Sequence, residues 1–314
     1  MERTTYARPV RSPMPTPVLV AFIVVAVVLS SWAGHLLVLR ILRWRGVTVT
    51  RTMFGTTFIF DATDEDGTPV RLLNVGGAFQ SACYVEDSLA YELVCEYQRA
   101  EADIVASLPT LRDVAFIGGG GFSFPKWVLR HLPPVRVAVA EIDPKIIDIA
   151  RRSFHLADAE CRYVPEGRLT IACEDGWEWL RGLEQPVDLI VNEAFSGRHP
   201  LGPLTGEEGA GLVHEKLANG GTYLANVRCP LEGRRSAALR ETANAFGREF
   251  AHVWVVPERP QEPTVAGNNT LVASDCDLVT AGCAALTGHE WAGTPEASRG
   301  GGGRRAGRRQ PYWP

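Results

Sequence analysis

The chain has 314 residues, of which 46% are hydrophobic, and its 32 Lys and Arg against 36 Asp and Glu give a formal net charge of −4. Residues 1–51 hold seven Arg and one Glu (+6) and residues 299–314 hold five Arg (+5), so residues 52–298 carry 20 basic and 35 acidic side chains (−15). Such an acidic core is not a nucleic-acid-binding one, because phosphate contacts need a basic surface. The composition also excludes collagen-like, disulfide-scaffold and wholly disordered chains.

Residues 1–17 form a tail ahead of a long apolar segment. Residues 18–39 contain no Asp, Glu, Lys or Arg, and at 1.5 Å per residue this run spans about 33 Å, enough for a hydrocarbon core of about 30 Å. We therefore expect a transmembrane helix at residues 18–42. A cleaved signal peptide, with small residues supplied by Ser31-Trp32-Ala33, and a buried core helix are the alternatives. Three Arg precede the run and four follow it, which predicts a single-pass protein of the cell membrane with its C-terminal domain in the cytoplasm.

Residues 47–85 have the pattern of a small β-hairpin unit. Residues 47–60 alternate and are rich in β-branched side chains, residues 64–67 read as a turn, and residues 70–75 read as a returning strand. The segment 86–107 then has apolar residues at helical spacing.

From residue 113 the chain alternates between strand and helix patterns, which predicts a mostly parallel sheet covered on both faces. The predicted strands are Val114–Ile117, Arg136–Ala140, Leu169–Ala172, Leu189–Asn192, Thr222–Val227, Val253–Val256 and Thr270–Ala273. The predicted helices are 124–132, 144–153, 176–183, 206–218 and 235–249. No long helix separates the last two strands, which indicates an antiparallel hairpin at the sheet edge. This folded part is assigned to residues 86–283, and residues 284–314 to a disordered basic tail.

Metal binding is not expected, because the seven Cys and seven His show no pattern of closely spaced ligands. The dispersed cysteines read instead as reduced thiols.

A glycine loop follows the first strand of the parallel part, in the sequence Ile117-Gly118-Gly119-Gly120-Gly121-Phe122. In an open α/β sheet, ligands bind at the carboxyl ends of the strands, and residues without side chains let a ligand approach the backbone and the start of the next helix. We therefore interpret this loop as a ligand-binding element.

Two further strands end in acidic residues. Glu141 follows the next strand, 20 residues after Gly121, where a carboxylate can accept both ribose hydroxyls of a nucleotide. Asp143 precedes Pro144 and is expected to cap a helix. Asp175, after the third strand, is placed either to accept from an adenine amine or to cap a helix. Trp177 and Trp179 read as core aromatics, with adenine stacking as the alternative.

A fourth strand ends at Asn192-Glu193-Ala194-Phe195-Ser196-Gly197. Glu193 emerges at a strand end ahead of a loop, residues 198–203, that could fold over a substrate. A carboxylate in this place could act as a general base.

Together and in this order, these segments resemble the spermidine synthase family of polyamine aminopropyltransferases, and the GGGGF loop with an N-terminal span resembles its bacterial membrane-linked subgroup. The resemblance runs from about Gly55 to Asp277 and is strongest in DVAFIGGGGFSFPKWVLRH, AVAEIDPKIIDIARRSF, ACEDGWEWL and VDLIVNEAFSG. It implies a seven-stranded methyltransferase-type Rossmann fold preceded by a β-hairpin unit. It also implies transfer of an aminopropyl group from decarboxylated S-adenosylmethionine, a co-substrate rather than a tightly bound cofactor, to an amine such as putrescine. Relatives are commonly dimers or tetramers, so a homodimer is a further expectation.

By position, the resemblance makes Glu193 the catalytic base. The donor-binding residues that it implies are Gln80, Gly118, Gly119, Gly120, Glu141, Asp175 and Gly176, and the acceptor-site candidates are Tyr91 and Ser196. The chain departs from the family on the acceptor side, where Gly121, Glu193 and Ser196 stand in the places of Asp residues.

Three functions follow from these observations. The first is an aminopropyltransferase acting on a cationic amine. The second is a methyltransferase that uses ordinary S-adenosylmethionine, and the third is a non-catalytic nucleoside-binding relative. A nicotinamide dehydrogenase is disfavoured, because Ser123 stands where the third glycine of the GxGxxG motif would be.

Overall fold

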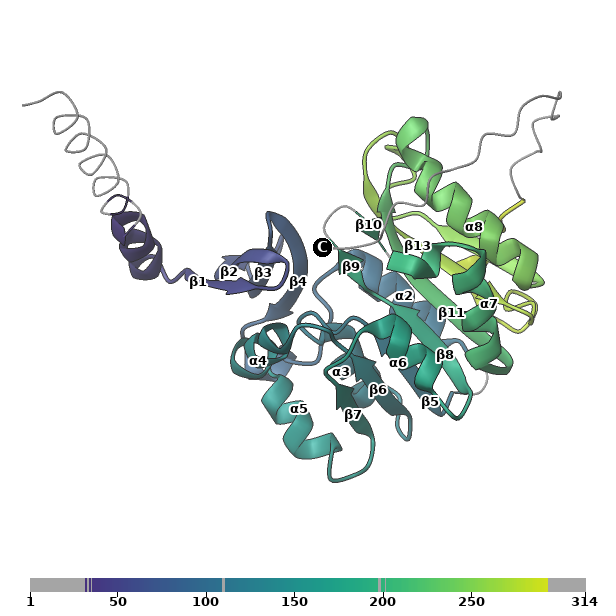
Figure 1. The fold of residues 1–314 in the computed structure, drawn as a ribbon, viewed down its shortest axis with the longest axis horizontal. Coiled ribbons are helices and arrows are strands. Elements are labelled where there is room, and N and C mark those ends of the chain that lie inside the picture. Colours follow the sequence, from purple (N-terminus) through teal and green to yellow (C-terminus); the bar gives the residue numbers. More distant parts are fainter. Residues whose placement is uncertain are drawn as a thin grey trace, which may run out of the picture.

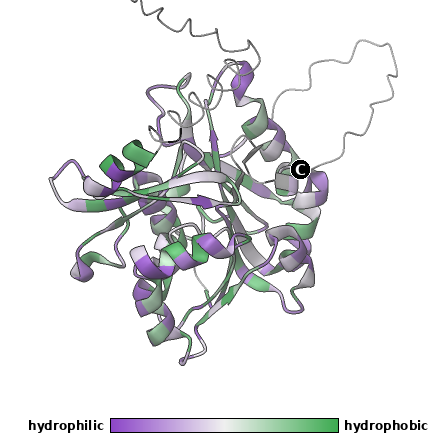
Figure 2. Cartoon of the chain, turned by 60° about the vertical axis from the view of Figure 1, so that its left-hand side comes forward, coloured by the Kyte–Doolittle hydropathy of each residue, from purple (hydrophilic) through white to green (hydrophobic). Residues whose placement is uncertain are grey.

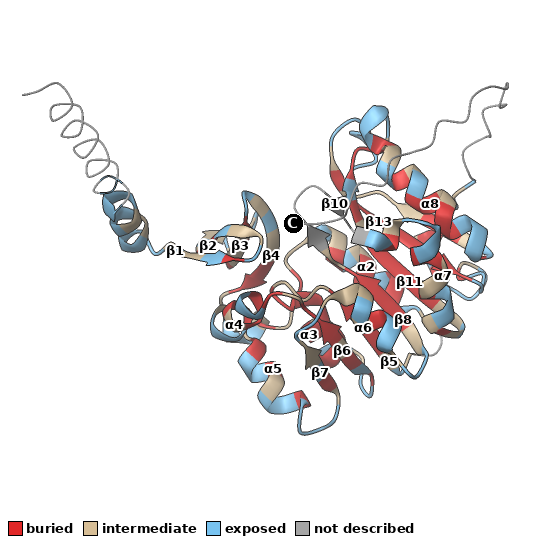
Figure 3. Cartoon of the chain, in the orientation of Figure 1, coloured by how far each residue is buried: buried red, intermediate tan, exposed pale blue. Residues whose placement is uncertain are grey.

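The computed structural model describes residues 32, 34, 36–108, 111–196, 199–200 and 202–292. Most of the expected transmembrane helix, residues 18–42, lies outside these residues. Residues 36–44 are helical and mostly exposed (Figure 3). In the part of the chain that the structure describes, no helix is long and apolar enough to cross a membrane.

An antiparallel sheet comes first in the chain (Figure 1). Its strands pair in sequence order, β1 (Thr48–Thr52), β2 (Gly55–Thr63), β3 (Pro69–Val75) and β4 (Ala78–Tyr84). The hairpin predicted from residues 47–75 is therefore extended by β4. A short 3-10 helix, η1 (Asp87–Leu89), and α2 (Glu96–Ala106) lead into the next sheet.

The second sheet has seven strands in the order β12-β13-β11-β8-β5-β6-β7. They are β5 (Asp113–Ile117), β6 (Arg136–Ala140), β7 (Leu169–Ala172), β8 (Val187–Asn192), β11 (Leu217–Cys229), β12 (His252–Val256) and β13 (Gly267–Ser274). Neighbours from β11 to β7 pair in parallel, while β13 runs antiparallel to both β11 and β12. The predicted mostly parallel sheet and its terminal antiparallel hairpin are confirmed.

Helices cover both faces of this sheet, because successive residues of its buried strands point to opposite sides. Val114 and Phe116 pack in one apolar cluster with residues of α2, α3 (Ser123–His131), α4 (Pro144–Ser153) and α5 (Leu156–Tyr163). Ala115 and Ile117 pack in a second cluster with α6 (Gly176–Gly182), α7 (Glu207–Lys216) and α8 (Ala237–Glu249). Buried residues gather in the sheet between these layers (Figure 3), and hydrophobic and hydrophilic residues alternate along the covering helices (Figure 2).

Several short elements complete the fold. They are β9 (Phe195–Ser196), β10 (His199–Pro200) and the 3-10 helices η2 (Gly202–Thr205), η3 (Arg234–Ser236) and η4 (Ala284–Leu286). β9 and β10 form a separate two-stranded antiparallel ladder.

The expectation that a disordered tail starts at residue 284 is wrong for residues 284–292. Leu286 is fully buried, and Trp291 donates from its backbone N to Val253 O at 2.7 Å and from its indole Nε1 to Asn244 Oδ1 at 2.9 Å. Apolar side chains in this segment thus extend the core beyond the last strand. Residues 293–314 lie outside the described part.

Candidate functional site

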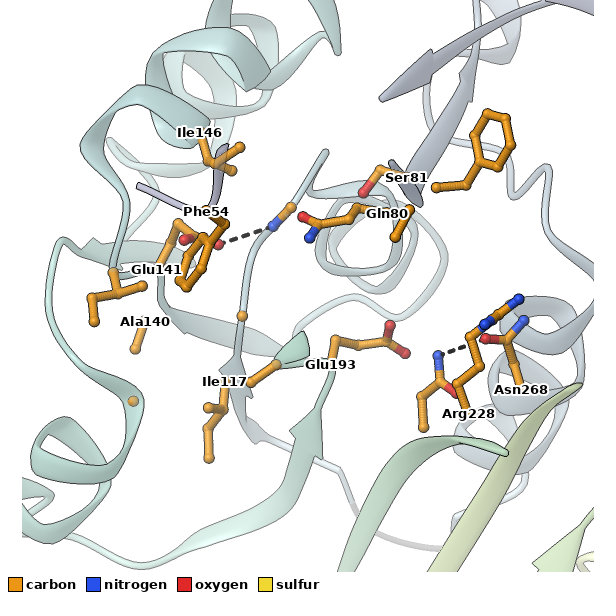
Figure 4. A pocket seen from close by; sticks show the side chains of 18 of the residues that line it. Phe54, Gln80, Ser81, Ile117, Ala140, Glu141, Ile146, Glu193, Arg228 and Asn268 are labelled. Atoms are coloured by element: carbon orange, nitrogen blue, oxygen red, sulfur yellow. Dashed lines mark hydrogen bonds between the residues drawn. The ribbon is translucent and has the colours of Figure 1, made fainter. Parts of the chain in front are cut away.

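A cavity of about 680 Å³ opens at the carboxyl ends of the parallel strands, next to β4 of the first sheet. It is lined by most of the residues proposed from the sequence as a donor-binding or catalytic set, namely Gln80, Gly118, Gly120, Glu141, Asp175, Gly176 and Glu193. Figure 4 shows Glu141 and Phe54 toward one end, Arg228 and Asn268 toward the other, and Glu193 between them.

The glycine loop is held in a conformation that needs glycine. Gly118 has φ +89°, and a Cβ there would lie 2.9 Å from Ala194 N and 3.0 Å from Glu193 C. Gly120 has φ +50°, and its Cβ would lie 2.6 Å from Ser81 Oγ. Positive φ and close backbone approach are both costly for residues with a Cβ. Gly118 therefore lets the ends of β5 and β8 meet, which brings the glycine loop next to Glu193.

Gly121, where the resemblance implies an acid, is enclosed by neighbouring residues. Its N–H donates to Ser81 Oγ at 2.8 Å. A Cβ at Gly121 would lie 2.9 Å from both Phe154 Cδ1 and Ser81 Cβ. Ser81 of β4 thus occupies the space that a side chain at this position would use.

Glu141 fixes the loop from the neighbouring strand. Its Oε2 accepts from Gly119 N at 2.9 Å and from Gly120 N at 3.1 Å, and its Oε1 accepts from Asp143 N at 3.0 Å. Burial raises the pKa of the Glu141 carboxyl, and the three N–H donors oppose that rise. The carboxylate therefore both orders the glycine loop and forms part of the cavity wall.

Asp143 and Asp175 begin helices, as their positions suggested. Asp143 Oδ1 accepts from Lys145 N at 2.9 Å at the start of α4. Asp175 Oδ1 accepts from Trp177 N at 3.0 Å and Glu178 N at 3.2 Å at the start of α6. The capping alternative for Asp175 is thus observed, and the residue also lines the cavity. Trp177 and Trp179 pack against the second apolar cluster, and Trp177 lines the cavity as well.

Glu193 directly follows β8 and is oriented by the turn after it. Its backbone N donates to Ile117 O at 2.9 Å. The fully buried Asn192 accepts from Ala194 N at 3.1 Å through Oδ1 and donates from Nδ2 to Tyr223 Oη at 3.0 Å. The Glu193 carboxylate accepts from Tyr97 Oη at 3.2 Å. Burial raises the pKa of Glu193, and hydrogen bonds from Glu101, Tyr97 and Asn226 oppose that rise.

Of the two acceptor-site candidates, the structure describes the side chain of Tyr91 alone. Tyr91 is absent from the cavity wall among the described residues, and its ring instead packs edge-on against Tyr163 at 6.2 Å beside Lys126. Tyr91 is partly buried and packs against the first apolar cluster. Ser196 belongs to β9, and its side chain lies outside the described part.

Several lining residues were not predicted from the sequence: Phe54, Ser81, Cys95, Tyr97, Asn226, Arg228 and Asn268. Asn226 and Arg228 stand at the carboxyl end of a predicted strand, so the rule used for Glu141 could have found them. Phe54 and Ser81 come from the first sheet, and no local pattern assigns them to the cavity. Within the described residues, no group of three His, Cys, Asp or Glu side chains could hold a metal ion.

The fold and cavity define the class of protein: an α/β protein of the methyltransferase-like type with a ligand cavity at the carboxyl ends of its strands. Residues 95–261, more than half of the chain, match the model of the spermine/spermidine synthase domain. The chain therefore belongs to the spermine/spermidine synthase family.

Curated relatives carry the same resemblance over part of the chain. The polyamine aminopropyltransferase of Neisseria meningitidis serogroup A is 29% identical over 137 residues, which are 43% of this chain and 49% of that protein. The polyamine aminopropyltransferase of Clostridium beijerinckii is 26% identical over 149 residues, 46% of this chain and 50% of that protein. The chain thus spans about half the length of the curated relatives that it matches.

Solved structures show the likeness in fold. A probable spermidine synthase from Corynebacterium glutamicum superposes with a TM-score of 0.61 at 20% identity, covering 73% of this chain and 80% of that one. Human methyltransferase-like protein 13 in complex with SAH gives a TM-score of 0.50 at 18% identity, covering 61% of this chain and 90% of that one. The methyltransferase-type fold expected from the sequence is therefore confirmed.

Proposed function

We propose that the chain transfers an aminopropyl group from decarboxylated S-adenosylmethionine to an amine acceptor such as putrescine. The observation that carries the proposal is the position of Glu193, which lines the same cavity as the glycine loop and Glu141. A base and a nucleoside-type site in one cavity fit a group transfer from a nucleoside donor to an amine. The curated relatives named above are polyamine aminopropyltransferases, which supports the same chemistry.

On the donor side, Glu141 would accept from the ribose hydroxyls, while Gly118, Gly119 and Gly120 leave room for the donor against the backbone. Asp175 would accept from the adenine amine, next to Gly176 at the start of α6. At Gly176 a Cβ would lie 2.4 Å from Ile117 Cγ2, so the backbone stays close to the strand end. Gln80 of β4 would contact the donor from the opposite wall.

In the transfer step, the neutral acceptor nitrogen attacks the donor carbon bonded to the sulfonium. The new N–C bond forms as the C–S bond breaks, and the bonding electron pair leaves with sulfur as a neutral thioether. The acceptor nitrogen then carries a positive charge, and Glu193 takes one of its protons. The sulfonium is already a good leaving group, so the protein's contribution is positioning and proton removal. Ser196 remains the proposed acceptor-side contact.

The test is mass analysis of products formed by the full-length protein in detergent with decarboxylated S-adenosylmethionine and a panel of amines. An acceptor heavier by one aminopropyl group, together with methylthioadenosine, is the expected result. Glu193→Gln should lower kcat by at least about 100-fold, while Glu208→Gln, an exposed carboxylate on α7, should not change it. Turnover that survives Glu193→Gln unchanged would remove Glu193 as the base. A methylated product formed with ordinary S-adenosylmethionine would replace the proposed reaction by methyl transfer.

We also propose that the N-terminal segment attaches the chain to a membrane. The sequence supports this with its uncharged run at residues 18–39. At the end of this run and just after it, the described residues Leu36, Leu37 and Ile41 are exposed beside Arg40 and Arg43. Basic residues at the end of an apolar helix fit the cytoplasmic surface of a membrane. Fractionation should recover the full chain with membranes after a high-salt or alkaline wash, and recovery in the soluble fraction would contradict the proposal. The homodimer remains a prediction, which size-exclusion chromatography of the protein in detergent would test.

A further inference from the structure

Glu101 is a fully buried acid outside the set of residues assigned to the reaction. It lies on α2, one helical turn after Tyr97, and its side chain is 0% exposed. It is not part of the cavity wall, whereas its hydrogen-bond partner Glu193 is. Burying a carboxyl group is costly unless the group is neutral or well paired. The position therefore needs a physical explanation.

Glu101 lies one turn after Tyr97 on α2, and Tyr97 Oη donates to the Glu193 carboxylate at 3.2 Å, which brings the carboxyl groups of Glu101 and Glu193 into hydrogen-bonding contact. Each keeps one enclosed oxygen, Glu101 Oε2 and Glu193 Oε1, to which no donor group in the described part of the chain is hydrogen-bonded. Two ionised carboxylates are both acceptors, so a hydrogen bond between them needs a proton on one of them. Two buried like charges in contact would also repel each other strongly. At neutral pH the pair should therefore hold one proton and one negative charge.

The surroundings of the two carboxyl groups decide which residue keeps the charge. Glu193 accepts from Tyr97 Oη at 3.2 Å, and the residue lines the cavity. Glu101 Oε1 accepts from Thr270 Oγ1 at 3.0 Å. Each carboxyl thus has one hydroxyl donor, but Glu193 lines the cavity and Glu101 does not, and contact with the cavity lowers the desolvation cost of a negative charge. The proton therefore belongs on Glu101 and the charge on Glu193.

Other titratable or charged groups near the pair come from three elements. Cys95 immediately precedes α2 and Arg99 lies in its first turn. Arg228 lines the same cavity from β11, and Glu258 follows β12. Burial raises the pKa of the Cys95 thiol to about 12, so it stays neutral at physiological pH. Arg99 is bound to Leu93 O and Tyr84 Oη, and Glu258 accepts from Asn268. None of these groups supplies the missing proton between the two acids.

We propose that Glu101 is a positioning residue whose protonated carboxyl donates to Glu193 and holds that carboxylate, ionised, toward the cavity. The proposal rests on the proposed function only for the role of Glu193 as a base. In the reaction cycle, Glu193 would accept the proton of the acceptor nitrogen, and the pair would then hold two protons until one returns to solvent. The state ready for the next turnover is again the singly protonated pair.

Two substitutions at position 101 separate this role from a structural one. Glu101→Gln keeps a donor toward Glu193, whereas Glu101→Leu removes it at similar size. The acid limb of the pH profile of kcat/KM reports protonation of the free enzyme's base. Glu101→Gln should leave the midpoint of this limb unchanged and keep kcat/KM within about threefold of the wild-type value. Leu should move the midpoint up by about 1 pH unit, because an ionised carboxylate loses a hydrogen bond. Glu96→Gln, at the exposed start of α2, is the matched control for loss of a carboxylate and should have no effect.

Infrared difference spectra against Glu101→Gln give a second readout that does not depend on activity. The wild type should show a protonated-carboxyl band that persists above pH 7 and is missing from Glu101→Gln. Absence of this band from the wild type would overturn the proposal. An acid limb of kcat/KM that moves to lower pH in Glu101→Gln would also overturn it. Either result would mean that Glu101 is ionised. If no amine is ever aminopropylated, the proposed function fails while the infrared result still decides whether the pair shares a proton. If Glu101→Leu does not fold, the pH profile and the infrared spectrum of Glu101→Gln still test the proposal.

Discussion

Met53 and Asp143 join the two sheets through a single hydrogen bond, from Met53 N to Asp143 Oδ2 at 2.6 Å. The same carboxylate caps α4 through Oδ1, and it is fully buried. Glu141 and Phe54 both line the cavity. Asp143 is two residues from Glu141, and Met53 is next to Phe54. Together with the bonds from Gly121 N to Ser81 Oγ and from Ser123 Oγ to Ala82 O, this side chain holds the first sheet against the wall of the cavity that we assign to the nucleoside.

Asp143→Ala should therefore weaken both the fold and the nucleoside site. Loss of the cap and of the bond to Met53 should lower the free energy of unfolding by about 2–3 kcal/mol. The dissociation constant for methylthioadenosine should rise several-fold, because Phe54 is no longer held at the wall. Chemical denaturation and calorimetric titration measure the two effects. Asp277→Ala removes a comparable local bond, to Thr280, away from the cavity and should not change the affinity; equal affinities in all three proteins would contradict this account.

Gly118→Ala should impair the site without removing a functional group. The added Cβ would lie 2.9 Å from Ala194 N and the residue would keep a φ of +89°, so the turn that presents Glu193 has to shift. A displacement of about 1 Å at a catalytic group can cost on the order of 100-fold in rate. We expect kcat to fall by this amount. Gly211→Ala, in α7 with open space around it, should leave kcat unchanged and raise stability slightly.

The buried strands and the order of the site segments could be predicted from the sequence, because a parallel strand covered on both faces is a continuous apolar run. Two elements were missed for local reasons. β4, with Gln80 and Ser81 in its middle, lacks an apolar alternation. α5 has only eight residues and follows His155, which adopts the left-handed conformation with φ +57°.

The partner of Glu193 was missed although the sequence carries a signal for it. Glu101 follows Tyr97 by four residues and precedes Ile104 by three, so it lies on the apolar face of α2. An acid on such a face is either exposed at its edge or buried with a partner. Which of the two applies to Glu101 depends on the position of Glu193 at the end of β8. The two residues are 92 positions apart in the chain, so no local pattern reveals their contact.

Lys126 makes stability depend on pH in the alkaline range. It is 1% exposed and donates from Nζ to Ala90 O and Phe154 O, at 2.8 and 2.6 Å. Burial lowers its pKa from 10.5 to about 8. Between these two values the unfolded chain holds a proton that the folded chain has released, so stability rises with pH there, by at most about 1.4 kcal/mol per unit. Below pH 8 this contribution is constant.

The comparison with Lys126→Met isolates this effect, because the thiols and phenols that titrate in the same range are common to both proteins. Urea unfolding at pH 7, 8, 9 and 10 should show the wild type gaining stability relative to Lys126→Met only above pH 8. Lys145→Met, on the exposed side of α4, controls for loss of an ammonium group that is exposed to water, although it also donates to Arg51 O. A wild-type advantage that falls between pH 8 and 10 would show that Lys126 keeps its charge in the folded state.

Arg228 places a positive charge in a cavity for which we propose cationic substrates. Arg228 is exposed and lines the cavity from the end of β11. Its guanidinium forms no ion pair with the carboxylates that the structure describes. A diamine entering next to it is repelled, at a cost of about 0.5–1 kcal/mol for partly solvated charges. Arg228→Gln should therefore lower KM for putrescine by about two- to fivefold, and high salt should reduce the difference. Arg259→Gln, which removes a surface charge paired with Glu262, should leave KM unchanged. A KM that rises tenfold in Arg228→Gln would mean instead that the guanidinium binds an anionic group of the substrate, and the acceptor would then be an amine that also carries a carboxylate.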